Sequence, residues 1–145
     1  MNLLTRIQKT RAILAFSFFI LALGDQSEAK PAKTKIYKVD EVNLSVSGAA
    51  KIKVSATGTV RTGGWTEGEL IPSSARGEKK DDADTITLNF DFVATKPTGG
   101  VTQALESIKA ETTCPAPGAG KKLKVVVHAE TNKDEGSIES PHRGP

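Results

Sequence analysis

Apolar and polar residues alternate along several short segments of the chain, which is the pattern of strands with one buried face. Residues 42–47 place Val42, Leu44 and Val46 on one side and polar residues on the other. Residues 51–60 repeat the pattern, with apolar side chains at positions 52, 54, 56 and 60. The intervening Gly-Ala-Ala at 48–50 permits a tight connection, so the two segments are predicted to form a hairpin. Residues 36–39 are also strand-like.

The clearest strand pattern covers residues 85–94. One face carries four apolar side chains, Ile86, Leu88, Phe90 and Phe92. We expect this strand to be central to the core, because both phenylalanines beyond residue 29 lie on its apolar face.

A last predicted strand covers residues 123–129, with its odd-numbered apolar residues facing inward and Val126 and His128 facing outward. The preceding segment, 101–114, is ambiguous, because its apolar residues fit either a strand or one to two helical turns. We predict a short turn or helical piece followed by a strand.

Three linkers rich in Gly, Pro and charge separate these segments, at 61–84, 95–100 and 115–122. Short strands with such punctuation and no long amphipathic helix indicate an all-β domain. The predicted fold is an immunoglobulin-like Greek-key β-sandwich, or a small barrel, of about six to seven strands. The domain is expected to cover residues 36–129, with a flexible leader at 30–35. Residues 130–145 are polar and nearly free of apolar side chains, so they are predicted to be a disordered tail.

The N-terminal region has the three zones of a secretory signal peptide. A basic start is followed by an apolar run at 12–23 and a polar stretch that ends in Ser27, Glu28 and Ala29. The apolar run is shorter than the ~20 residues that a membrane-spanning helix needs. We therefore predict a cleavable signal over residues 1–29, with a cut after Ala29 or, alternatively, after Gly24. A periplasmic or secreted protein is expected, with no membrane span in the mature form.

Charge and cysteine usage restrict the partner classes. The 20 basic residues are nearly balanced by 17 acidic ones and do not cluster with aromatic residues, so no nucleic-acid partner is expected. Cys114 is the only cysteine in the chain and can form a disulfide only with another chain. A buried, inert thiol is the preferred interpretation, because unmodified Cys behaves as a small hydrophobic residue.

No catalytic, metal or cofactor site is predicted. The two histidines, His128 and His142, have no partner at the spacing of a zinc or copper site. The acidic residues at 81–84 lack the ligand pattern of a calcium loop. Cys114 with His128 is the sole candidate dyad, and we do not expect it to be catalytic. The chain is therefore predicted not to be an enzyme.

A loop that carries the only tryptophan is the candidate partner-binding segment, comprising Gly63, Gly64, Trp65, Leu70 and Pro72. Trp65 could be a rigid anchor for a partner, presented on flexible backbone. Alternatively, the ring folds over an open end of the sandwich and completes the core, since a Trp buries roughly 150–250 Å². The second interpretation is preferred.

Three pieces of the chain resemble segments shared by a group of small exported bacterial proteins of unknown function. They are Thr62 to Trp65 with Leu70 and Pro72, the Phe-Asp-Phe-Val-Ala run at 90–94, and the Thr-Gln-Ala-Leu run at 102–105. The resemblance implies a location in the bacterial envelope and no particular activity. The charged loop at 73–84 is longer than that of the group.

The predicted function is an exported, non-enzymatic module of the cell envelope that binds a macromolecule or an envelope component. One alternative is an inhibitor of secreted proteases that inserts the loops at 63–65 and 97–100 into an active-site cleft. Another is a structural envelope subunit that pairs through an exposed edge strand.

Overall fold

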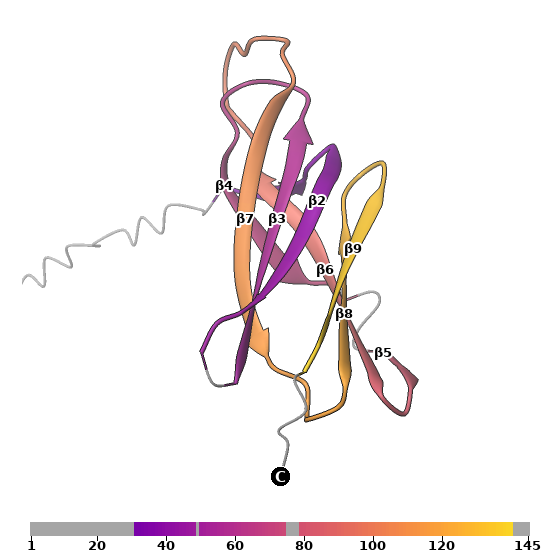
Figure 1. The fold of residues 1–145 in the computed structure, drawn as a ribbon. Helices are drawn as coiled ribbons and strands as arrows, with labels where there is room; N and C mark the ends of the chain where they lie inside the picture. The colour runs from indigo at the N-terminus through magenta and orange to yellow at the C-terminus, as the bar shows by residue number, and fades with distance from the viewer. Residues whose placement is uncertain (1–30, 49, 75–78, 141–145) are drawn as a thin grey trace, which may run out of the picture.

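A computed structural model describes residues 31–140 except residues 49 and 75–78, and of residues 79–82 it describes the backbone. The predicted signal at 1–29 and the last five residues of the predicted tail lie outside the described residues. The described chain contains nine strands and no helix, arranged in two open sheets that pack face to face (Figure 1). The prediction of an all-β sandwich is therefore confirmed, and its sheets do not close into a barrel.

The smaller sheet has three antiparallel strands in the order β2-β3-β7. The larger sheet has six strands, with β6 at its centre. The bounds of the smaller sheet's strands are Lys38–Val46 for β2, Lys51–Val60 for β3 and Glu106–Pro115 for β7. Those of the larger sheet are Lys33–Lys35 for β1, Thr66–Pro72 for β4, Lys79–Asp82 for β5, Thr85–Thr95 for β6, Lys122–His128 for β8 and Lys133–Glu139 for β9.

Strand β6 pairs with four other strands of the larger sheet. Along one side it pairs with β8 and then with β1, and along the other with β5 and then with β4. All these pairings are antiparallel except that of β6 with β8, which is parallel. A parallel pair needs a crossover connection, and here the chain crosses by way of β7 in the smaller sheet. The sandwich thus departs in one pairing from the antiparallel sheets of an immunoglobulin-like fold.

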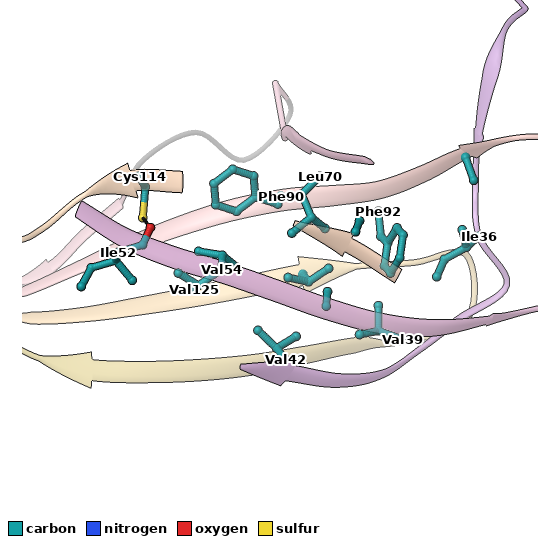
Figure 2. Packing of buried hydrophobic residues seen from close by; sticks show 14 of the residues in the cluster. Ile36, Val39, Val42, Ile52, Val54, Leu70, Phe90, Phe92, Cys114 and Val125 are labelled. Atoms are coloured by element: carbon teal, nitrogen blue, oxygen red, sulfur yellow. Dashed lines mark hydrogen bonds between the residues drawn. The ribbon is translucent and has the colours of Figure 1, made fainter. Parts of the chain in front are cut away.

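The core lies between the two sheets and follows the predicted alternation (Figure 2). Phe92 of β6, Val54 of β3 and Val125 of β8 are all 0% exposed. Phe90 is 7% exposed. Ile86 and Leu88, in the N-terminal half of β6, are partly buried and pack against the core. The predicted facing of β3, β6 and β8 and the predicted hairpin of β2 with β3 are therefore confirmed.

Two glycines allow the edges of the two sheets to approach each other. On one side β4 contacts β7, and a Cβ atom on Gly68 would lie 2.4 Å from the backbone oxygen of Lys109. On the other side β2 contacts β9, and a Cβ atom on Gly136 would lie 2.3 Å from Cδ1 of Leu44. The backbone oxygen opposite Gly68 cannot turn away, so only a residue without a Cβ fits there, whereas the Leu44 side chain opposite Gly136 can adjust.

The prediction of a disordered tail from residue 130 is wrong for residues 133–139, which form β9. This strand pairs antiparallel with β8 along its whole length, and its Ile138 packs against the core. Its stability comes from ladder hydrogen bonds to β8 and from packing on β2, which a composition-based argument does not detect. The leader at 30–35 is corrected in the same way, because residues 33–35 form β1 and pair with the end of β6.

The linker predicted at 61–84 is also partly wrong, because it contains β4 and β5. Its strand character depends on tertiary pairing: Leu70 lies opposite Phe92 in the ladder of β4 with β6 and is 4% exposed. In the ambiguous segment 101–114, a strand begins at Glu106 and residues 101–105 form no helical turn.

Candidate partner-binding end of the sandwich

Two loops that are far apart in sequence lie against each other at one end of the sandwich, at the top of Figure 1. One loop, 61–65, joins β3 to β4, and the other, 96–105, joins β6 to β7. The backbone N–H of Gly63 donates a hydrogen bond to the carbonyl oxygen of Thr102 at 3.1 Å. The N–H of Gly64 donates to Oε2 of Glu106 at 3.3 Å. We call these two loops together the loop end.

Both glycines of the first loop suit its conformation and its close contact with the second loop. Gly64 has a φ of 82°, a left-handed conformation that disfavours other residues. A Cβ atom on Gly63 would lie 2.7 Å from Oε1 of Glu106 and 3.0 Å from Oγ1 of Thr102. The Gly-Gly pair therefore packs the first loop closely against the second, and does not serve to keep the loop flexible.

Trp65 is half-buried and packs against the hydrophobic core. Its indole Nε1–H donates a hydrogen bond to Oγ1 of Thr62 at 3.0 Å. These contacts agree with the interpretation in which the ring covers the end of the sandwich. The same side chain also lines a surface pocket, so its position allows contact with a ligand as well.

That pocket has a volume of about 450 Å³ and lies beneath the loop end. Its aromatic and charged lining residues are Lys35, Tyr37, Arg61, Trp65, Lys96 and Glu130. The guanidinium carbon of Arg61 lies 4.2 Å from the centre of the Tyr37 ring, a cation–π contact. Arg61 Nη2 also lies 3.9 Å from Glu130 Oε1. Lys35 Nζ is paired with Asp91 Oδ1 at 2.9 Å, just outside the lining, so the net positive charge of the pocket comes from Lys96. Two aromatic rings provide apolar surface within the pocket.

The second loop, which lines this pocket with Lys96 and Gln103, also carries two exposed apolar side chains. Leu105 is 70% exposed and Val101 is 36% exposed. Aromatic and apolar anchors surrounded by polar groups are typical of protein-binding surfaces. The loop end therefore combines apolar contact area, a positive pocket and a backbone held by cross-loop hydrogen bonds.

The structure separates the five residues of the candidate binding segment. Gly63, Gly64 and Trp65 belong to the loop end, whereas Leu70 is buried in the core. Pro72, the last residue of β4, pairs with Phe90 in the middle of β6. An extended strand advances about 3.3 Å per residue, so β4 carries Pro72 away from the loop that precedes it. The inclusion of Leu70 and Pro72 in the binding segment is corrected accordingly.

Sequence reasoning missed most of the pocket residues. Lys35, Tyr37 and Glu130 come from the ends of β1, β2 and β8 and are brought to the loop end by strand pairing. The N–H of Glu130 donates a hydrogen bond to the carbonyl oxygen of Ile36 at 2.9 Å, which joins two of these ends. Of the missed residues, Arg61 lies nearest in sequence to the glycine pair, two residues before Gly63.

Cys114 and His128 point to different sides of the molecule. Cys114 is 6% exposed, and its thiol donates a hydrogen bond to the carbonyl oxygen of Ile52 at 3.7 Å. Burial raises the pKa of this thiol above its ordinary value. His128 lies on the face of β8 away from the core, with Nε2 3.1 Å from Oδ1 of Asn89. The preferred interpretation of Cys114 as a buried thiol is consistent with these contacts.

His128 and Val126 were predicted to face outward on β8. Neither belongs to the core cluster, but both are covered and only 7% exposed.

Within the described ranges, no group of three or more His, Cys, Asp or Glu residues is arranged to hold a metal ion. The same part of the chain contains no helix with the length and apolar character needed to cross a membrane.

No family model, curated protein or solved structure matches this chain. The resemblance to a group of small exported bacterial proteins therefore stays a prediction.

Proposed function

We propose that this chain is an exported, non-enzymatic binding module of the bacterial cell envelope, and that its loop end contacts a macromolecule or another envelope component. The export part of the proposal rests on the three-zone pattern of residues 1–29. The binding part rests on the geometry of the loop end.

The contact between the two loops is the observation that carries the proposal. Hydrogen bonds from the backbone of Gly63 and Gly64 hold the loops together, so the surface is ordered before any partner arrives. Preorganised surfaces lose less conformational entropy on binding. Leu105 supplies apolar contact, and the pocket lined by Lys96 and Gln103 of the same loop supplies charge.

The test is capture of an envelope component by the purified protein, with variants that change the loop end alone. We expect Leu105→Asp and Lys96→Glu each to reduce capture at least tenfold. The first variant removes apolar contact area from the proposed surface, and the second reverses a positive charge there. Val46→Asp is the matched control, since Val46 is a comparably exposed apolar residue, at 60%, next to the β2–β3 turn at the other end. Equal capture by all three variants would contradict the assignment of the surface.

Inhibition of a secreted protease is the second candidate, and one observation favours it. The two loops named for this role in the sequence, 63–65 and 97–100, do lie together, because a Cβ atom on Gly64 would be 3.3 Å from Cβ of Pro97. A panel of serine and cysteine proteases separates the candidates. Slowed cleavage that Leu105→Asp relieves and Val46→Asp does not would favour inhibition.

The structural-subunit alternative requires an edge strand that can pair with a partner. The edge strands β4 and β2 lie against β7 and β9 of the facing sheet, whereas β1 and β5 pair only with β6 in the described part of the chain.

A further inference from the structure

A second pocket lies between the two sheets, near the end of the sandwich opposite the loop end. Its walls come from the end of β4, the middle of β6 and the last residues of β7. Its volume is about 370 Å³, which corresponds to about a dozen water-sized atoms at about 30 Å³ each. The pocket is therefore large enough for a small organic molecule and too small for a folded partner.

The exposed surface of the wall is mostly apolar, and its polar lining residues, Asn89, Thr112, Thr113 and Ser73, are uncharged. Leu88 and Phe90 of β6 face the space between the two sheets, and Pro72 and Pro115 are the last residues of β4 and β7. None of the described residues that line this pocket carries a charge. An ionised ligand would lose its hydration without gaining a counter-charge, so the pocket selects neutral molecules.

Among the polar residues of this wall, Ser73 is the one with a buried side-chain oxygen that lacks a hydrogen-bond partner within the described part of the chain. Ser73 is 3% exposed. Its backbone N–H donates to the carbonyl oxygen of Asn89 at 2.9 Å, which fixes its position beside β6. A buried hydroxyl without a partner is unfavourable, and a ligand that exchanges a hydrogen bond with it would relieve this cost.

Apolar pockets with one or a few convergent polar groups are typical of small-molecule sites. We propose that this pocket binds a neutral amphiphile of roughly eight to ten carbons with a single hydroxyl or carbonyl group, and that Ser73 binds this polar group. The hydrocarbon part then packs on Leu88 and Phe90. This inference is independent of the proposed loop-end function, since the two sites share no residue.

Cys114 provides a reporter for the site. It lines the pocket and is the only cysteine in the chain. A bound ligand would cover its thiol, so alkylation by iodoacetamide, followed by intact mass, should slow when the pocket is filled.

The experiment uses protein expressed from the full-length chain and purified in the form that the cells accumulate. Three probes of equal chain length are titrated: 1-octanol, octane and octanoate. We expect 1-octanol to bind with a Kd of about 0.1 mM or tighter, to slow Cys114 alkylation at least fivefold and to shift the amide NMR signals of residues 88–90. Octanoate at neutral pH and octane should bind at least tenfold more weakly.

Ser73→Ala tests the polar contact, and Ser45→Ala, at an exposed position of β2, is its matched control. Ser73→Ala should remove the preference for octanol over octane, while Ser45→Ala should preserve it. If octanol, tested up to its aqueous solubility, neither slows Cys114 alkylation nor shifts these NMR signals, it does not bind in the pocket and the proposal is wrong. Retention of the octanol preference in Ser73→Ala would overturn the role of Ser73.

Discussion

Gly68 is the position where β4 comes closest to β7, and its replacement by alanine tests how the sheets meet. The residue sits at a bulge in the ladder of β4 with β6, next to Glu67, whose φ is 53°. A Cβ atom on Gly68 would lie 2.4 Å from the backbone oxygen of Lys109 and 3.2 Å from Cγ1 of Ile108. Both neighbours belong to β7, and a backbone oxygen cannot rotate away as a side-chain end can.

The magnitude follows from that contact. Ordinary van der Waals contacts of a Cβ atom lie at 3.4–4 Å, so a Cβ at 2.4 Å requires β4 or β7 to move by about an ångström. Strain of this kind costs typically about 1–3 kcal/mol and occasionally more. Set against a total stability of about 5–15 kcal/mol, Gly68→Ala should lower the melting temperature by at least about 4 °C, since 1 kcal/mol corresponds to roughly 4–8 °C in a domain of this size.

Urea denaturation followed by circular dichroism, with thermal melting as a second probe, measures the effect. Gly100→Ala is the matched control, because a Cβ atom there would meet nothing within 4 Å and the residue has no positive φ. This control should be neutral or stabilising by about 0.4–1 kcal/mol. A Gly68→Ala protein whose urea midpoint equals that of the wild type would refute the close approach of β4 and β7.

Three further predictions concern the core, the pH dependence and the N-terminus. Phe92→Ala should destabilise by about 3–5 kcal/mol in urea denaturation, because Phe92 is fully buried; a loss below 1 kcal/mol would contradict its central position. Hydrogen bonds from the Thr59 hydroxyl and then the Lys38 ammonium lower the pKa of Asp40. The stability that Asp40 adds, under about 1 kcal/mol for this exposed group, is therefore present above about pH 4 and lost as the pH falls through the lowered pKa. The urea midpoints of wild type and Asp40→Asn should accordingly converge in acid, and a gap that persists at pH 2 would rule this out. If the signal is cut after Ala29, intact mass of protein from the native host should correspond to a chain that starts at Lys30, and retention of Met1 would exclude export by cleavage.

The alternation of apolar and polar residues was sufficient to predict the strands that bury one face. In β3 and β6 the apolar residues recur at every second position, because a strand points successive side chains to opposite sides. Their inward facing, the β2–β3 hairpin and the fold class could therefore be read from the sequence. The Gly63-Gly64-Trp65 segment also stood out in the sequence as a candidate binding segment, because it places the only Trp next to a glycine pair.

Tertiary structure alone decided the remaining parts. Strands β1 and β9 have few apolar residues and are ordered by backbone pairing with β6 and β8, a contact between segments distant in sequence. The parallel pairing of β6 with β8 depends on the crossover through β7, which no local pattern specifies. The pocket at the loop end likewise joins Lys35, Arg61 and Glu130 from three separate strand ends. Alternation along a strand determines which side chains face inward, whereas pairing between strands determines which of their ends meet.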